Sequence, residues 1–263
     1  MPLVEYTARE GLAHLVLNVP PANCYSFEMM KELDAAILEA RFDPDVHVLV
    51  LSGAGEKFFC AGADISMLKG ADPYFKYNFC LHANETLLRL EQTPKLVIAA
   101  IDGHCVGGGL EVAMAADIRI ARTGSGKCGL PEVKLGVLPG TGGTQRMVRM
   151  LGKSRAIELM ASGEVFGFDR AAELGLINRL LEADDHDGFM GQVEEYAKTF
   201  VPPAQASRAV GLIKRACQTG AEVGLTDGLA LERELQQRLF EGDDAREGLA
   251  AYIEKRPPAF SGK

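Results

Sequence analysis

The sequence predicts an α/β fold in which parallel strands alternate with helices, followed by a mostly helical region. Two continuous apolar runs, 46–51 and 96–101, indicate strands buried on both faces, which is typical of parallel sheets. A third strand is indicated at 118–121, and helical patterns separate the three. Such repeats favour parallel β/α layering with right-handed crossovers. With 263 residues, 47% of them hydrophobic, the chain can bury a substantial core.

The N-terminal part of the sequence predicts strands first and then helices that alternate with strands. Residues 2–18 alternate well enough for one or two strands with a turn near 9–11. Ser26 is a suitable N-cap for a helix over 27–41, whose apolar residues form one stripe. After the first buried strand comes a glycine-rich turn and then the small-residue segment 58–65, and residues 74–92 indicate another helix.

The pattern from about residue 140 onward is nearly all helical. Glycine and proline signals separate helices expected near 142–150, 153–161, 167–174 and 189–199. Pro202 and Pro203 mark a joint, after which 204–256 predicts two or three amphipathic helices. We therefore predict a core over 1–200 and a helical C-terminal region over 201–263, packed on the body, on a neighbouring subunit, or on both.

Composition limits the function classes. The formal net charge of −8 argues against a broad nucleic-acid surface, although a local basic patch can still serve one anionic ligand. No apolar run reaches the roughly 18 residues that a membrane helix needs. The start of the chain resembles neither a secretory signal nor a transit peptide. The six cysteines are scattered among apolar neighbours, which favours reduced, mostly buried thiols. We expect a cytoplasmic protein without a metal.

The run Gly107-Gly108-Gly109 enters an apolar helix that extends to about Ala115. Glycine allows close approach of the backbone to a ligand, and the first N–H groups of a helix lack intrahelical partners. One oxyanion-hole donor from this run is therefore physically reasonable. Tight packing of helix on strand, with no ligand, is the structural alternative. The spacing does not match a dinucleotide-binding motif.

A second donor is available in the segment Ala61 to Asp64, which again combines small residues, the end of a strand and the start of a helix. Asp64 can equally serve only as the cap of that helix. Two backbone N–H groups that bind one carbonyl oxygen stabilise the negative charge that grows there, by several kcal/mol if the loss of one donor, about 2.7–4 kcal/mol, is a guide.

Two glutamates follow these donors in apolar, glycine-rich surroundings. Glu111 comes one helical turn after Gly108 within an apolar stretch, and Glu132 follows Pro131. Each can be a first-turn glutamate that stabilises its helix dipole, with Pro131 at a helix start. As a pair downstream of two candidate oxyanion donors, they favour proton transfer on a carbonyl compound.

A third cluster of small residues lies at 139–146 and ends in Thr144, Gln145 and Arg146. It can cradle a phosphate or form a helix N-terminus beside the site. No lysine follows the glycines in the manner of a P-loop, so that motif is disfavoured.

These segments, in their order and spacing, resemble the crotonase (enoyl-CoA hydratase/isomerase) superfamily over nearly the whole chain. The motifs that carry the resemblance are FCAGADI at 59–65, DGHCVGGGLE at 102–111, ADIRIA at 116–121, GLPEVKLG at 129–136 and PGTGGTQR at 139–146. The resemblance implies a crotonase-like fold of repeated ββα units with a helical C-terminal trimerisation region. It also implies a homo-oligomer, either a trimer or a dimer of trimers.

By position, the resemblance assigns the oxyanion-hole N–H groups to Ala63 and Gly108, and the acid/base pair to Glu111 and Glu132. It assigns further contacts with the substrate and its CoA moiety, with Gly140 beside the water site: Ala61, Ala63, Asp64, Ile65, Ser66, Gly108, Gly140, Tyr252 and Lys255. Coenzyme A is then part of the substrate, and no separate cofactor is needed.

We therefore expect an enoyl-CoA hydratase that adds water syn to a 2-enoyl-CoA and gives a 3-hydroxyacyl-CoA. The alternatives are an enoyl-CoA isomerase, a specialised hydratase of branched or dicarboxylic acyl-CoA of the 3-methylglutaconyl-CoA type, and, in another class, an RNA-binding relative, which the acidic charge disfavours. Tyr25 and Cys128 depart from the commonest hydratase pattern and can shape the acyl pocket.

Overall fold

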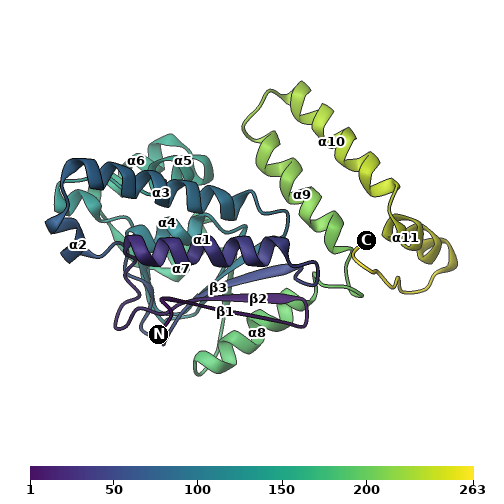
Figure 1. Cartoon of the computed structure of the whole chain (residues 1–263), viewed down its shortest axis with the longest axis horizontal. Coiled ribbons are helices and arrows are strands. Elements are labelled where there is room, and N and C mark those ends of the chain that lie inside the picture. The colour runs from purple at the N-terminus through teal and green to yellow at the C-terminus, as the bar shows by residue number, and fades with distance from the viewer.

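A six-stranded sheet forms the centre of the body in the computed structural model, which describes residues 1–263 (Figure 1). Only its first two strands pair antiparallel, and every other neighbouring pair is parallel, as the buried apolar runs predict. In spatial order the strands are β1 (Val4–Arg9), β2 (Leu12–Leu17), β3 (Val48–Gly53), β5 (Leu96–Ile101), β7 (Ile118–Arg122) and β10 (Arg179–Leu181).

Helices cover both faces of this sheet (Figure 1). The helices α1 (Phe27–Phe42) and α3 (Pro73–Glu91) lie over one face, and α8 (His186–Lys198) lies under the other. Alternate residues of β3 pack into the two apolar clusters, one on each face of the sheet. Leu49 belongs to the larger apolar cluster on the α1 side, and Val48 belongs to the smaller cluster with Phe189 of α8.

Helix starts follow the capping residues that the sequence offers. The Ser26 hydroxyl accepts a hydrogen bond from Met29 N at 3.2 Å, which confirms the predicted start of α1. The short helix α2 (Ile65–Gly70) begins after Asp64, whose carboxylate accepts from Ser66 N at 2.8 Å. Asp64 therefore caps α2, and its contact with the substrate stays a prediction.

A second, four-stranded sheet consists of β4 (Phe58–Cys60), β6 (His104–Val106), β8 (Lys127–Gly129) and β9 (Val165–Gly167). The first three are mutually parallel, and β9 runs antiparallel to β8. Strands β9 and β10 are two exceptions to the nearly all-helical pattern expected after residue 140. Each has only three residues, too few to establish an alternating pattern in the sequence.

The remaining elements of the body lie around the small sheet. Helix α4 (Gly108–Met114) is buried along its whole length, which explains its alanine-rich composition. The others are the 3₁₀ turn η1 (Glu132–Leu135) and the helices α5 (Gly143–Leu151), α6 (Lys153–Ser162) and α7 (Phe168–Leu174). The expected α/β class with a helical C-terminal region is confirmed.

The last three helices, α9 (Ser207–Gly220), α10 (Leu225–Phe240) and α11 (Asp243–Glu254), form an arm that stands beside the body (Figure 1). A buried ion pair of 2.8 Å between Lys214 and Asp117 ties α9 to the body. Large apolar side chains on α10 and α11 are exposed, with Leu225 79% and Ile253 78% accessible.

All six cysteines are free thiols. Three of them, Cys60, Cys105 and Cys128, are fully buried, Cys24 and Cys80 are half-buried, and Cys217 on α9 is exposed. Full burial, expected for most of the thiols, therefore holds for half of them. No helix combines the length and apolar character needed to cross a bilayer. No group of three or more His, Cys, Asp or Glu side chains is arranged to hold a metal ion.

Candidate active site

The segment after β4 presents a free backbone N–H at Ala63. Tyr25 N donates to Gly62 O at 2.9 Å, and Asp64 N donates to Tyr25 O at 3.0 Å, which forms a parallel bridge. These two bonds hold residues 62–64 in place and leave the Ala63 N–H without a partner in the chain. An unpaired amide held in this way is a preorganised hydrogen-bond donor.

The segment after β6 presents a second free donor at Gly108. Gly107 takes φ 57° and ψ −134°, a conformation that essentially only glycine adopts, and this turn starts α4. Gly108 is the first residue of the helix, so its N–H has no intrahelical partner. A methyl group added at Gly62 would lie only 3.0 Å from Gly108 N. The two donor segments are therefore adjacent.

Glu111 is buried in α4, with 2% of the residue exposed. Its Oε1 accepts hydrogen bonds from Thr141 N at 2.8 Å and Gly143 N at 2.7 Å. Both backbone bonds reach the same oxygen, which leaves Oε2 free of backbone donors. Burial raises the pKa of Glu111, and the two N–H groups oppose that rise because they favour the carboxylate.

Glu132 is the first residue of η1 and follows Pro131, as the sequence predicts. Its Oε2 is shielded from solvent and accepts no hydrogen bond. Burial, together with the negative charge of Glu111, raises the pKa of Glu132 to about 7. A methyl group at Gly107 would lie 3.1 Å from Glu132 Oε1, so the carboxyl group lies against the turn that precedes Gly108.

The loop 139–143 completes the site. Sequence reasoning predicted a helix N-terminus beside the site as one reading of this cluster, but missed that Thr141 and Gly143 hold Glu111. The sequence signal that could have revealed this contact was the pair of glycines ahead of α5. The structure explains the second glycine, because a side chain at Gly143 would lie 2.9 Å from Glu111 Oε1. Gly140, assigned to the water site, belongs to the same loop.

Two unpaired backbone N–H groups and two carboxyl groups of raised pKa thus come together at the ends of β4, β6 and β8. The donors can bind one oxygen on which negative charge develops, and the carboxyl groups can exchange protons with atoms nearby. Such a fold and site are typical of enzymes that can stabilise negative charge on a substrate oxygen and move protons beside it.

Comparison with known proteins gives the family. A model of the enoyl-CoA hydratase/isomerase family matches residues 7–263. The chain belongs to this family and is an enzyme. The resemblance to crotonases in the sequence motifs is thereby confirmed.

Individual relatives agree with this assignment. The chain is 38% identical over 250 residues to a short-chain-enoyl-CoA hydratase of Clostridium acetobutylicum, covering 94% of each chain. It is 33% identical over 255 residues to a crotonyl-CoA hydratase of Syntrophomonas wolfei, covering 97% of this chain and 96% of the relative. A crystal structure of an enoyl-CoA hydratase from Geobacillus kaustophilus superposes with a TM-score of 0.96 at 43% identity, covering 100% of this chain and 98% of the other.

The residues assigned to CoA binding fall into two groups. Ala61, Asp64, Ile65 and Ser66 flank the Ala63 donor, and Ile65 is 56% exposed. Tyr252 lies in α11, with Lys255 directly after it, at the opposite end of the molecule from α2 (Figure 1). The structure therefore does not bring these two residues to the site within one chain. Cys128, expected at the acyl pocket, is fully buried in β8.

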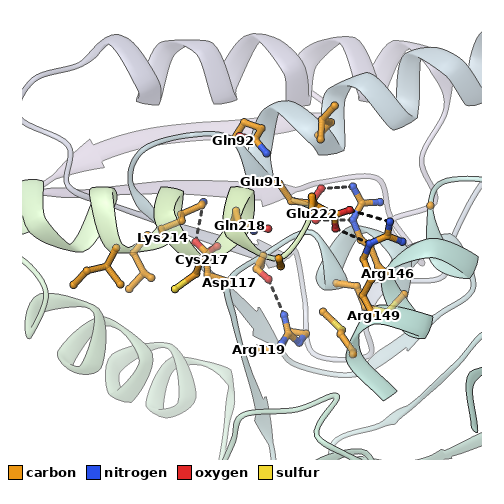
Figure 2. A pocket seen from close by; sticks show the side chains of 18 of the residues that line it. Glu91, Gln92, Asp117, Arg119, Arg146, Arg149, Lys214, Cys217, Gln218 and Glu222 are labelled. Atoms are coloured by element: carbon orange, nitrogen blue, oxygen red, sulfur yellow. Dashed lines mark hydrogen bonds and ion pairs between the residues drawn. The ribbon is translucent and has the colours of Figure 1, made fainter. Parts of the chain in front are cut away.

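A cavity of about 950 Å³ is separate from the two glutamates, neither of which lines it (Figure 2). It lies where α9 meets the body and is bordered by α3 and α5. Figure 2 shows three of its cations with acidic partners, in the pairs Arg146–Glu91, Arg149–Glu222 and Lys214–Asp117 at 2.6, 2.6 and 2.8 Å. The fourth, Arg119, donates to the backbone carbonyls of Leu176 and Ala116. None of the predicted site residues lines this cavity.

Proposed function

We propose that this enzyme is an enoyl-CoA hydratase that adds water reversibly and syn to a 2-enoyl-CoA, giving a 3-hydroxyacyl-CoA. The observation that carries the proposal is the Glu132 carboxyl group, whose Oε2 accepts no hydrogen bond. Burial and the charge of Glu111 raise its pKa to about 7, and it lies against the turn that precedes the Gly108 donor. Family membership and the hydratases among the relatives support hydration.

The backbone donors act on the thioester. The N–H groups of Ala63 and Gly108 bind the thioester oxygen and stabilise the enolate-like transition state, in which that oxygen gains negative charge. Because the donors are held by the Tyr25 bridge and by the start of α4, they need no rearrangement as the charge develops. We expect each donor to contribute about 2.7–4 kcal/mol to the barrier reduction.

The two glutamates move protons. The oxygen of water bonds to C3, Glu111 takes one proton from that water, and Glu132 gives one proton to C2. Glu111 thereby gains a proton and Glu132 loses one, so the pair keeps a single shared proton and the reaction releases none. Syn addition follows because both carboxyl groups act from one face of the substrate.

The assembly belongs to the same proposal. We infer that the C-terminal arm packs against neighbouring copies, because its exposed apolar side chains on α10 and α11 need a partner surface. A trimer, or a dimer of trimers, would place Tyr252 and Lys255 of one copy near the CoA-binding segment of another. The segment formed by Ala61, Asp64, Ile65 and Ser66 would hold the nearer part of CoA.

A panel of 2-enoyl-CoA thioesters tests the activity. Short, medium, branched, dicarboxylic and aromatic substrates are incubated with the enzyme, and the loss of the conjugated enoyl absorbance is followed. A hydratase consumes these substrates and forms the 3-hydroxyacyl product, which mass spectrometry detects as a gain of one water. The relatives named for short-chain and crotonyl substrates support the four-carbon ester as the first substrate.

The same assay identifies an isomerase. An isomerase shifts the double bond without adding water, so the product mass is unchanged and a 3-enoyl-CoA gains absorbance. If the enzyme performs only that shift on every member of the panel, the proposed hydration is wrong.

A further inference from the structure

Tyr25 contacts three separate parts of the site. Its backbone forms the bridge that holds residues 62–64. Its ring packs so closely under Gly108 that a methyl group there would lie 2.6 Å from Cε1 and 2.1 Å from the phenol oxygen. Its hydroxyl lies 2.8 Å from Thr141 Oγ1, in the loop that holds Glu111. One side chain therefore links both oxyanion donors with the glutamate loop.

Thr141 connects Tyr25 to Glu111 through its backbone. The Tyr25 hydroxyl holds its Oγ1 at 2.8 Å, and its N–H donates to Glu111 Oε1 at 2.8 Å. Tyr25 and Thr141 are only 2% and 4% exposed, so water does not replace either partner readily.

We propose that Tyr25 is a positioning residue for the reaction. Its hydroxyl holds the Thr141 side chain, which keeps the Thr141 N–H on Glu111 and so keeps that carboxylate aligned and ionised. This inference rests on the proposed hydration, in which Glu111 takes a proton from water. A hydrogen bond received by the charged form favours that form, so a well-placed Thr141 N–H helps to keep Glu111 ionised.

Other charged and titratable groups face these residues. Glu132 of η1 and Arg146 of α5 act on Glu111, and Arg146 is paired with Glu91 of α3. Arg146 Nη1 also donates to the Thr141 carbonyl at 3.2 Å. The thiols of Cys60 and Cys80 lie near the Tyr25 hydroxyl. Arg146 thus supports the loop through its backbone, whereas Tyr25 supports the Thr141 side chain.

The test removes single hydroxyl groups. Tyr25→Phe keeps the ring under Gly108, and we expect kcat to fall about three- to tenfold with KM unchanged. The acid limb of the kcat/KM profile moves to higher pH, because Glu111 protonates more readily when the Thr141 N–H is held less firmly against it. Thr141→Val has the same two effects, and Thr141→Ser, which keeps the hydroxyl, restores wild-type values.

A double-mutant cycle shows whether Tyr25 acts through Thr141. In the Thr141→Val background, Tyr25→Phe causes no further loss, whereas independent roles would give multiplicative losses. Tyr6→Phe is the matched control, because the Tyr6 hydroxyl is buried without a hydrogen-bond partner, and its kcat stays at the wild-type value. A Tyr25→Phe enzyme with wild-type kcat and pH profile, or losses that multiply in the cycle, overturns the proposal.

A second measurement does not depend on the substrate. The carboxyl carbons of ¹³C-labelled glutamate are titrated by NMR, with the Glu111 signal assigned from its absence in Glu111→Gln. Tyr25→Phe raises the pKa of the Glu111 carboxyl group, and an unchanged titration overturns the inference. If the wild-type enzyme hydrates no member of the panel, the proposed function fails while this titration still decides the role of Tyr25.

Discussion

The two glutamates of the site lie in contrasting regions. Glu111 belongs to a helix that is buried throughout, and two backbone N–H groups hold one of its oxygens. Glu132 begins a single 3₁₀ turn that continues into exposed apolar residues, among them Leu135 at 63% and Leu138 at 66%, and its Oε2 has no partner. One carboxyl group is held firmly, and the other is bound weakly at the edge of the same site.

This difference suits two different tasks. A carboxylate that accepts two N–H bonds keeps its orientation and its charge, which favours a base that positions water. A carboxyl group without such donors keeps its proton to higher pH, and the pKa of Glu132 near 7 makes it the better proton donor at neutral pH. The same residue type thus acquires two roles from its surroundings.

The largest expected effect comes from removing the proton of the weakly bound carboxyl group. Glu132→Gln keeps the size of the side chain but cannot donate to C2, and we expect kcat to fall by about 10²–10⁴-fold or more. Initial rates with the best enoyl-CoA of the panel measure this. Glu195→Gln on the exposed side of α8 is the control and keeps the wild-type rate. Near-normal turnover in Glu132→Gln would remove Glu132 from the mechanism.

The pH profile sharpens the same comparison. The active state carries one proton on the pair, so wild-type kcat/KM declines as the pH rises above about 7, where Glu132 ionises. The reaction releases no proton, so hydration and dehydration both start from the form of the enzyme with one proton on the pair. The decline of kcat/KM at high pH, the basic limb of the profile, therefore lies at the same pH in both directions. The residual activity of Glu132→Gln lacks the limb. A limb that persists unchanged in the variant must belong to another group.

A smaller effect is expected from disturbing the firmly held carboxylate. Gly143→Ala places a methyl group 2.9 Å from Glu111 Oε1 and from Leu130 Cδ1, so the loop or the glutamate must move. We expect kcat to fall about ten- to hundredfold, since a displacement near 1 Å can reduce a rate by that order. The kinetics are measured with the same substrate.

Gly136→Ala is the matched change on the Glu132 side. Gly136 has φ 75°, and a methyl group there meets no atom within 4 Å. The alanine strains the backbone by about 1–2 kcal/mol, which lowers stability, while kcat changes less than about threefold. If Gly136→Ala were as damaging to kcat as Gly143→Ala, the contrast between a firmly held and a weakly held carboxyl group would be wrong.

The sequence predicted the body better than the details of the site. Long apolar runs and the Ser26 cap predicted β3, β5 and α1, because periodicity and capping are local properties. The strands β9 and β10 were not predicted, because a strand of three residues is too short to show a periodic pattern. Such a strand forms only when its partner strand is present.

For the site, the residues nearest the glycine motifs could be predicted, and their partners could not. The motifs pointed to Ala63, Gly108, Glu111 and Glu132, which the structure brings together, while their roles in the reaction stay a prediction. The contact of Tyr25 with Thr141 joins residues 116 positions apart, and no local pattern reports such a distance. Whether residues 1–200 and 201–263 act as core and assembly region also stays a prediction.

The smallest effect concerns stability, and its sign follows from the raised pKa of Glu132. Below about pH 4.5 the carboxyl group is protonated in both the folded and the unfolded chain and has no effect. Between about pH 4.5 and 7 the unfolded chain ionises first, so this group lowers stability progressively as the pH rises. Above about pH 7 the full penalty of burying the charge remains.

Glutamine at position 132 cannot ionise and therefore escapes this penalty. A shift from 4.5 to about 7 corresponds to roughly 3 kcal/mol, which solvent at this partly exposed group reduces to about 1–2 kcal/mol. We expect the Tm of Glu132→Gln, relative to wild type, to be about 2–5 °C higher at pH 8 than at pH 4.5. Calorimetry at both pH values measures this difference, and Glu195→Gln controls for the loss of one charge. If the difference in Tm between Glu132→Gln and wild type were the same at both pH values, the pKa of Glu132 would not be raised. The contrast with Glu111 would then have to rest on geometry alone.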